Sequence, residues 1–463
     1  MPDILLTHGY FLMEDEKERQ IMKPYPTLGL LYISAYLKRA GFGVEIYDST
    51  FGGKLELFTK LATEQPGVLG IYSNLMTRQN VVAIIGEAKR RGWTVVLGGP
   101  ESANYPNEYL AQGADVIING EGEQTLAELL PALSKYGPHR LHGIAGTVFR
   151  DETGQMISNI EREQIADIDS IPWPDRAAIP MEKYVDVWRT HHGMGSVNLI
   201  TARGCPYKCK WCSHAVFGYS HRRRNYLDCV NEVQHIYDSY KPDQVWYADD
   251  VFTISHRWLY DYAAELKKRN LRLPFETISR ADRMMDERVL ETLASMGCYR
   301  IWIGSESGSQ RILDSMERGV KVEQVQWATK TAQKHGIEVG MFLMWGYDGE
   351  TLDDIEATVD HVKKANPNIF LTTVAYPIKN TPYYKKVSDA VSLDQDWVNS
   401  TDRDYRIKGR HSRAYFKHAD RLLKSEVAAF RVEEKDPVEA VRLRAEAQVA
   451  RAGLIATADE VEA

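Results

Sequence analysis

The stretch "SVNLITARGCPYKCKWCSH", residues 196–214, joins a strand-like apolar run to a loop that holds three of the chain's five cysteines. Cys205, Cys209 and Cys212 follow the spacing C-x3-C-x2-C, and His214 stands two residues further on. Thiolates suit both zinc and iron–sulfur clusters. We favour an iron–sulfur cluster, because structural zinc sites usually serve small domains and pair ligands from two separated segments. A [4Fe–4S] cluster held by three thiolates leaves one iron open for an external ligand.

The chain after this loop repeats a strand–helix unit. Further strand-like runs are "DQVWYAD", "LPFETISR", "CYRIWIGSE", "GIEVGMFLMWG" and "NIFLTTVAYP", each followed by a helix-like segment. Six units are fewer than the eight of a closed barrel. Residues 191–390 are therefore predicted to form a partial (β/α)6 barrel, with functional residues after its strands.

The chain before the loop shows a second alternation of strands and helices, which predicts a parallel sheet covered on both faces. Glycines follow these runs, and ligands of such sheets bind at the carboxyl ends of the strands. We expect an α/β protein with a Rossmann-like binding domain over 1–140, a hairpin and proline-rich linker over 141–190, the partial barrel over 191–390, and a small helical region with a flexible tail over 391–463.

Composition excludes several classes of protein. A net charge of −7 argues against a general nucleic-acid surface, which needs a positive face. The basic run at 221–224 is interpreted as a solvated loop rather than a phosphate site. No stretch approaches the ~20 apolar residues of a membrane span. We expect a cytoplasmic protein, because the chain opens without a leader-like segment and its cysteines suit a reducing compartment.

The cysteine loop after the first barrel strand resembles that of the radical S-adenosylmethionine (SAM) enzymes, in which an aromatic residue such as Trp211 precedes the third cysteine. The resemblance implies that Cys205, Cys209 and Cys212 hold a [4Fe–4S] cluster. It also implies that SAM chelates the open iron and is cleaved to a 5′-deoxyadenosyl radical. His214 has no role in that scheme.

Later strand ends match the same family and imply further SAM contacts. "YADDVFT" places Asp249 and Asp250 to accept from the SAM ammonium, and "SRADR" places Arg280 to pair with its carboxylate. In "GSESGS", Glu306 is expected to accept from the ribose hydroxyls, with Ser307 beside it. "GYDGET", 346–351, is similar to the family's Gly-Leu-Pro-Gly-Glu-Thr turn but has Asp348 in place of proline, which leaves the substrate in doubt.

The segment "VVLGGPESANYPNEYLAQGADVIINGEGEQTLAELL" is similar to the cobalamin-binding (B12-binding) domain fused ahead of many radical SAM enzymes, the BchE-like subfamily. No Asp-x-His-x-x-Gly string is present, so the resemblance implies base-off cobalamin without a protein histidine beneath the cobalt. The residues expected to line the cobalamin are Thr7, His8, Leu28, Gly29, Ser73, Asn74, Leu75, Gly98, Gly99, Gly120 and Glu121.

The resemblance predicts a cobalamin-dependent radical SAM enzyme that methylates an unactivated carbon through a 5′-deoxyadenosyl radical and methylcobalamin. As an alternative, it also permits oxidative cyclisation or rearrangement without methyl transfer. A zinc-stabilised binding protein is the alternative from another class. The expected partners are a small-molecule substrate, apolar or planar in view of the aromatic residues near the last strand ends, and an electron donor such as flavodoxin or ferredoxin.

Overall fold

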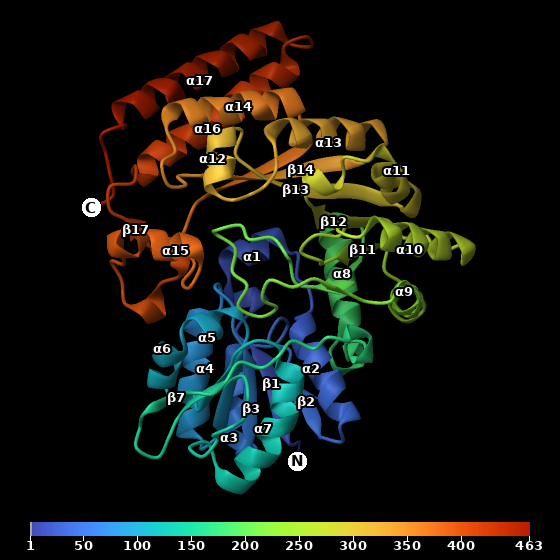
Figure 1. The fold of residues 1–463 in the computed structure, drawn as a ribbon, viewed down its shortest axis with the longest axis vertical. Coiled ribbons are helices and arrows are strands. Elements are labelled where there is room, and N and C mark those ends of the chain that lie inside the picture. The colour runs from blue at the N-terminus through green and yellow to red at the C-terminus, as the bar shows by residue number, and fades with distance from the viewer. Residues whose placement is uncertain (1) are drawn as a thin grey trace. The chain divides into compact units, whose positions relative to one another are not determined.

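The computed structural model describes residues 2–463, and the chain forms two compact units (Figure 1). The first unit comprises the chain up to Pro206 together with Ser213–Trp246 and Gln395–Thr401. The second unit comprises Tyr207–Cys212, Tyr247–Asp394 and Asp402–Ala463. The chain therefore passes from one unit to the other inside the cysteine loop, between Pro206 and Tyr207.

A mixed seven-stranded sheet forms the centre of the first unit, in the order β2-β1-β3-β4-β5-β6-β7. Its strands are β1 (Ile4–His8), β2 (Val44–Ile46), β3 (Val68–Tyr72), β4 (Thr94–Gly98), β5 (Val116–Ile118), β6 (Thr147–Arg150) and β7 (Met156–Ser158). The first five are parallel, and the hairpin β6–β7 adds two antiparallel strands at one edge. This Rossmann-like arrangement confirms the predicted class of the amino-terminal region.

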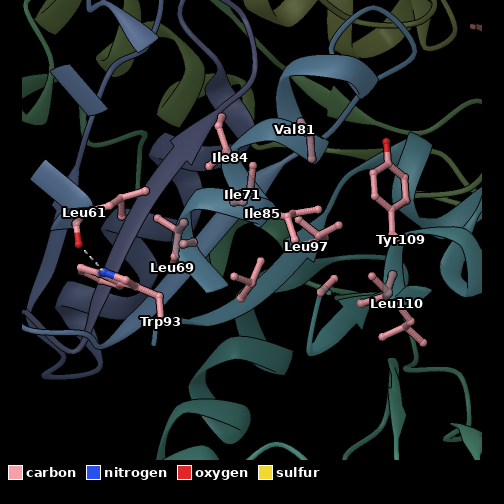
Figure 2. Close-up of a cluster of buried hydrophobic side chains, with 14 of the residues drawn as sticks. Leu61, Leu69, Ile71, Val81, Ile84, Ile85, Trp93, Leu97, Tyr109 and Leu110 are labelled. Carbon is pink, nitrogen blue, oxygen red and sulfur yellow. Dashed lines mark hydrogen bonds between the residues drawn. The ribbon is translucent and has the colours of Figure 1, made fainter. Parts of the chain in front are cut away.

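Helices cover both faces of this sheet because its strands are apolar on both sides. Leu5, Leu69 and Leu97 pack against α3 and α4 on one face, and the alternate residues Leu6 and Val96 pack against α2 and α7 on the other. Figure 2 shows the first of these cores, in which the Trp93 indole N–H donates to the carbonyl of Leu61 at 3.0 Å. The helices of this unit are α1 (Glu16–Ile21), α2 (Leu28–Arg39), α3 (Lys54–Thr63), α4 (Arg78–Arg90), α5 (Pro100–Asn104), α6 (Pro106–Ala111), α7 (Gly122–Tyr136), α8 (Met181–His192) and α9 (Tyr226–Tyr240).

One expectation for this unit is wrong. The basic run at 221–224 is not a solvated loop, because none of its side chains is exposed. Arg224 donates to the fully buried Glu232 at 2.5 Å, and Arg222 donates to Glu121 at 2.6 Å. Buried carboxylates need such partners. The run therefore neutralises internal carboxylates, and charge density in the sequence could not reveal those partners.

The second sheet has six strands in the order β15-β14-β13-β12-β11-β8. They are β8 (Ser196–Leu199), β11 (Gln244–Tyr247), β12 (Phe275–Ser279), β13 (Cys298–Glu306), β14 (Glu338–Trp345) and β15 (Ile369–Val374). The strands from β12 to β15 pair in parallel, which confirms the predicted class of this region. Two short antiparallel ribbons, β9 (Ala202–Arg203) with β10 (Arg222–Arg223) and β16 (Val391–Ser392) with β17 (Arg406–Ile407), complete the strands.

Helices follow the strands of the second unit, and two long helices end the chain. They are α10 (His256–Lys268), α11 (Glu287–Met296), α12 (Gln310–Ser315), α13 (Val322–Lys334), α14 (Leu352–Ala365), α15 (Pro382–Val387), α16 (Arg413–Val432) and α17 (Pro437–Ala456). Figure 1 shows α14, α16 and α17 grouped together, and Ile355 and Val359 of α14 share a core with Leu422 and Leu454. No helix within residues 2–463 is both long and apolar enough to cross a bilayer.

The final residues form hydrogen bonds in the structure. The Glu462 carboxylate accepts from the Ile407 N–H at 2.7 Å and pairs with Arg410 at 2.9 Å. The backbone N–H of Glu462 also donates to the carbonyl of Arg410 at 2.7 Å. The flexibility of this tail and the bounds of the four predicted regions stay predictions.

Candidate active site

The second half of the cysteine loop is fixed to the second unit by its backbone. The Lys210 N–H donates to the carbonyl of Met316 at 3.1 Å, and the Lys210 carbonyl accepts from the Tyr383 N–H at 2.9 Å. Trp211, which lies between Cys209 and Cys212 in the sequence, packs against the apolar cluster that contains Met316 and Tyr383. The loop is therefore anchored through its spacer residues, which leaves the thiols of Cys209 and Cys212 to face polar groups. Cys205 directly precedes Pro206, where the first unit's long segment ends.

Two guanidinium groups converge on the thiol of Cys209. Nη1 of Arg280 and Nη1 of Arg318 each donate to Cys209 Sγ at 3.7 Å. A hydrogen bond from Cys212 lowers the pKa of Cys209, and the charges of Arg318 and Arg280 lower it further against the opposing effect of burial. Thiolates are the form in which cysteine binds metal. This donor set therefore fits a negatively charged, thiolate-bound cluster.

Arg280 stands where sequence analysis places it, after β12, and all three of its guanidinium nitrogens have partners. Its Nε donates to Asp282 at 2.9 Å, and its Nη2 donates to the carbonyl of Arg318 at 2.7 Å. The guanidinium lies 3.6 Å from the ring centroid of Tyr207. Stacking and hydrogen bonds hold this group in one orientation beside Cys209. Its pairing with the SAM carboxylate stays a prediction.

Arg318 is a site residue that sequence reasoning missed. It lies in the loop after α12, is 7 % exposed, and donates from Nη2 to the carbonyl of Gly304 at 2.9 Å. Its Nε is buried without a hydrogen-bond partner among residues 2–463. A buried donor without a partner is costly, so this group is suited to receive an acceptor from a ligand. In the sequence "DSMERGVK", Arg318 looks like an ordinary exposed charged residue. The only signals that could have identified it are the glycine that follows it, Gly319, and its place after the strand-end motif "GSESGS".

Glu306 ends β13, where sequence analysis expects the ribose contact. Its backbone adopts the left-handed conformation with φ +63°, which is uncommon for a residue with a side chain. Burial raises the pKa of its carboxyl to about 7, although the charge of Arg318 opposes that shift. A Cβ on Gly304 would lie 2.7 Å from Oε1 of Glu306 and 2.8 Å from Nη2 of Arg318. Glycine at 304 therefore gives room for both charged groups.

The remaining predicted SAM contacts differ in where their side chains lie. Ser307 turns toward α14, where its hydroxyl lies 3.3 Å from that of Thr358. Asp249 is buried and Asp250 is exposed, both just beyond β11. The Phe252 N–H donates to the carbonyl of Ile278 at 3.0 Å, which ties the segment after them to β12. The structure thus brings Arg280 and Glu306 to the cysteine loop, and the ligand roles of all five acidic, basic and serine residues stay predictions.

In the first unit, the glycines predicted to line a ligand fall into two groups. A Cβ on Gly29 or Gly98 would meet no heavy atom within 4 Å, so the backbone can be approached closely at both positions. Gly99 and Gly120 have φ values of +105° and +81°, a backbone conformation that residues with a side chain rarely adopt. A Cβ on Gly99 would also lie 2.4 Å from the carbonyl of Ser73. Gly98 ends β4 and Gly29 lies in the first turn of α2, so the open backbone at these two positions fits a large planar ligand such as cobalamin.

The polar residues predicted at the same strand ends mostly bond within the protein. Thr7 Oγ1 donates to the Tyr47 carbonyl at 3.0 Å, and Ser73 Oγ lies 2.9 Å from the Tyr109 hydroxyl. Leu28 is buried at the start of α2, and Leu75 is partly buried after β3. Asn74 is one of the residues that line a cleft of about 830 Å³, together with others of 9–20 and 74–80 and with Lys54. Their contacts with a cofactor stay predictions.

His8 is held by hydrogen bonds on both ring nitrogens. Its Nε2 lies 3.3 Å from Asp48 Oδ1, and its Nδ1 accepts from the Tyr10 N–H at 3.2 Å. The Tyr184 hydroxyl also donates to Asp48 at 3.0 Å. Burial opposes ionisation of Asp48, but the hydrogen bond with His8 lowers the pKa of Asp48 overall. With both nitrogens engaged, His8 is not available as a metal ligand in this conformation.

Glu121 is also engaged by protein groups. Its carboxylate accepts from Arg203 and Arg222 at 2.6 Å each and from the Ile165 N–H at 2.9 Å. Arg203 bridges to Glu123 at 2.6 Å. Sequence analysis could not foresee this network, because its arginines lie about 80 and 100 residues further along the chain. The carboxylate anchors the loop after β5, and a cofactor contact from Glu121 stays a prediction.

Comparisons with known families agree with this geometry. Residues 199–362 match the model of the radical SAM superfamily, and residues 20–130 match that of the B12 binding domain. An uncharacterized methyltransferase of Pyrococcus horikoshii is 29% identical over 398 residues, which are 83% of this chain and 84% of that protein. The anaerobic magnesium-protoporphyrin IX monomethyl ester cyclase of Rubrivivax gelatinosus is 24% identical over 384 residues, 81% of this chain and 68% of the cyclase.

A solved structure shares the fold of almost the whole chain. The cobalamin-dependent S-adenosylmethionine radical enzyme OxsB, solved with aqua-cobalamin and S-adenosylmethionine bound, matches with a TM-score of 0.73 at 18% identity. The match covers 98% of this chain and 72% of OxsB. At this identity the likeness concerns the fold.

The chain is a radical SAM enzyme with an amino-terminal B12-binding domain. Its cofactors are a [4Fe–4S] cluster, S-adenosylmethionine and cobalamin. Among its relatives are both methyltransferases and the anaerobic cyclases of the BchE-like subfamily. This assignment replaces the zinc-stabilised binding protein considered from the cysteine spacing alone.

Proposed function

We propose that this enzyme methylates an unactivated carbon of a small molecule. When bound, the three cofactors supply an organic radical that can break a C–H bond and a methyl group that can be placed on the resulting carbon radical. Side chains cannot deprotonate such a carbon, since no accessible pKa is high enough for general base catalysis. The observation that carries the proposal is the 29% identity to a methyltransferase across 83% of the chain.

The cluster would be held by Cys205, Cys209 and Cys212 in this proposal. Arg280 and Arg318 donate hydrogen bonds to one of these sulfurs and keep it ionised. Glu306 would accept from the SAM ribose, and Arg318, with a buried nitrogen free to donate, would contact the SAM carboxylate together with Arg280. Asp249 and Asp250 would accept from the SAM ammonium.

The B12-binding domain would take cobalamin at the carboxyl ends of its strands. Gly29 and Gly98 offer open backbone to the ligand, and His8 is retained by Asp48 and the Tyr10 N–H. We infer a base-off cobalamin without a protein imidazole on the cobalt. The electron for the cluster would come from a small carrier such as flavodoxin or ferredoxin.

The substrate is proposed to be apolar or planar. Tyr347, in the loop after β14, and Tyr383, in α15, stack with ring centroids 4.7 Å apart and are buried in the apolar cluster that also contacts Trp211. Trp345 is less suited to contact a substrate, because it packs in the core beneath α16 and α17. Tyr376 and Tyr384, which follow β15 and are partly exposed, are better suited to contact a substrate than these buried rings.

A second candidate is an oxidative cyclase or another rearrangement enzyme that uses the same cofactors. The 24% identity to the anaerobic cyclase over 81% of the chain favours it. Product analysis separates the two reactions. Both reactions release 5′-deoxyadenosine. Methylation also releases S-adenosylhomocysteine and carries label from methyl-labelled SAM into the product, whereas cyclisation gives no S-adenosylhomocysteine and an unlabelled product.

The first experiment is anaerobic reconstitution with iron, sulfide and cobalamin, followed by assay of SAM cleavage. Cys205→Ala, Cys209→Ala and Cys212→Ala should each abolish cluster loading. His214→Ala should load normally, because the His214 ring packs against Tyr219 with ring centroids 4.0 Å apart and its Nδ1 lies 3.1 Å from the Gly218 carbonyl. Protein that binds one zinc through His214 and no iron would contradict the proposal.

A further inference from the structure

The turn that carries Glu306 begins with a β-bulge. In the pairing of β13 with β14, Gly304 is opposite Phe342 and Glu306 is opposite Leu343, so Ser305 is an extra residue in β13. A bulge bends its strand and changes the direction of the neighbouring side chains. Glu306 follows directly with a φ of +63°. The direction of the Glu306 carboxylate therefore depends on how Ser305 is held.

One face of α14 holds this turn by hydrogen bonds to alternate residues. Asp354, Thr358 and His361 are spaced i, i+4 and i+7 and share a face of the helix. The contacts are His361 Nε2 to Ser305 Oγ at 2.9 Å, Thr358 Oγ1 to Ser307 Oγ at 3.3 Å and to the Gly308 N–H at 2.9 Å, and Asp354 Oδ1 to Ser309 Oγ at 2.6 Å. Serines on both sides of Glu306 thus bond to α14, and the carboxylate lies instead beside Gly304 and Arg318.

The helix and the turn are in close contact at Gly308. A Cβ there would lie 2.5 Å from both the Ala357 carbonyl and the Thr358 Cα, so the backbone of the turn rests directly on α14. His361 is neutral in this setting, because burial lowers its pKa to about 4. The Gln326 amide donates to His361 Nδ1 at 3.3 Å, which leaves the ring proton on Nε2 to be donated to Ser305.

We propose that His361, through its hydrogen bond to Ser305, is a positioning residue that fixes the bulge and thereby aims the Glu306 carboxylate at the ribose of SAM. The inference rests on the proposed function, in which Glu306 binds that ribose. No group of His361 touches SAM in this scheme. Its contribution is to limit the conformations of a strained turn, and strained turns persist only where their surroundings determine them.

The test measures SAM affinity by equilibrium dialysis of the cluster-loaded protein, with iron content and thermal unfolding measured in parallel. Ser305→Ala removes the acceptor and His361→Leu removes the donor. Each should weaken SAM binding about 3- to 10-fold, the range for loss of one neutral hydrogen bond. His361→Gln, whose amide can donate to Ser305 from a similar place, should restore most of the affinity. Iron content should not change.

A double-mutant comparison with Glu306 distinguishes the positioning role from a merely structural one. If Ser305 acts through Glu306, the Ser305→Ala/Glu306→Ala protein should bind SAM no more weakly than Glu306→Ala alone. Asp360→Asn, on the exposed face of α14, is the matched control and should bind SAM normally. Wild-type affinity in folded, loaded Ser305→Ala and His361→Leu overturns the inference when Glu306→Ala is impaired. Wild-type affinity in Glu306→Ala overturns the ribose assignment and the inference with it.

Discussion

A Cβ on Gly304 would lie 2.7 Å from Oε1 of Glu306, well inside the closest approach of two such atoms. The same Cβ would lie 2.8 Å from Nη2 of Arg318. Two charged groups that serve the candidate SAM site therefore share the space above one glycine. The first glycine of "GSESGS" is therefore required because a side chain at 304 would clash with the Glu306 and Arg318 groups beside it.

Gly304→Ala should weaken SAM binding while the cluster still loads. Overpacking costs typically 1–3 kcal/mol, and if that cost falls on the bound conformation the affinity drops by about 5- to 150-fold. Equilibrium dialysis of loaded protein measures it. Gly53→Ala is the control, because a Cβ at Gly53 meets no atom within 4 Å. Equal SAM affinity in the two variants would contradict the steric argument.

Arg318→Gln should lower the reduction potential of the cluster by an amount on the order of tens of millivolts. Hydrogen bonds to cluster sulfurs and local charge both set such potentials, and Arg318 supplies both to Cys209 at 3.7 Å. Removing a positive charge disfavours the reduced cluster. A redox titration followed by electron paramagnetic resonance measures the shift.

The control for this prediction is a charge-matched substitution away from the cysteines. Arg288→Gln removes the same charge from an exposed side chain whose guanidinium lies 4.0 Å from the ring centroid of Tyr260. Its potential should match that of the wild type. A potential in Arg318→Gln that equals the one in Arg288→Gln would show that Arg318 does not tune the cluster.

Local patterns in the sequence predict the architecture because each strand and helix is specified by nearby residues. The alternation of apolar runs with amphipathic segments predicts both sheets, and the spacing of Cys205, Cys209 and Cys212 predicts the thiolate loop. The strand ends predict Arg280 and Glu306, because functional groups of such folds follow their strands. These features depend on short-range periodicity, which a single sequence displays.

The residues that sequence reasoning missed are those whose roles depend on long-range contacts. Arg318 reaches Cys209 across more than 100 residues of sequence. His361 meets Ser305 across 56 residues, and Arg222 meets Glu121 across 101. In the sequence these are ordinary members of a charged loop, an amphipathic helix and a basic run. Only the packing of the elements brings each pair together.

Glu350→Gln should make the protein more stable than the wild type as the pH rises. Burial raises the pKa of the Glu350 carboxyl to about 8, although one of its oxygens accepts from the Gly346 N–H at 2.6 Å. The folded-state pKa lies above the unfolded value of about 4.5. The protonated carboxyl thus contributes stability that is fully present below pH 4.5 and is lost as the pH rises toward 8.

The measurement for this prediction is the free energy of unfolding of both proteins at several pH values. Relative to Glu350→Gln, the wild type should lose stability between about pH 4.5 and 8, by an amount on the order of a few kcal/mol. The comparison of the wild type with Glu287→Gln should show the opposite pH dependence, with the wild type losing stability as the pH falls, because Lys334 and His335 lower the pKa of Glu287. A difference between wild type and Glu350→Gln that is constant across this range would place the Glu350 carboxyl at an ordinary pKa.

His8→Gln should leave the coordination of bound cobalamin unchanged. The imidazole is engaged by Asp48 at 3.3 Å and by the Tyr10 N–H at 3.2 Å, so the domain offers the cobalt no free nitrogen from this side chain. Electron paramagnetic resonance of the Co(II) form should show no nitrogen hyperfine splitting in the wild type, and the spectrum of His8→Gln should be the same.

Asp48→Asn is the informative companion, because it weakens the partner of His8 without removing the imidazole. If splitting is absent from the wild type and appears in Asp48→Asn, then Asp48 is what keeps His8 from the cobalt. Splitting already present in the wild type and absent from His8→Gln would show instead that His8 is the axial ligand, and the base-off assignment would be wrong.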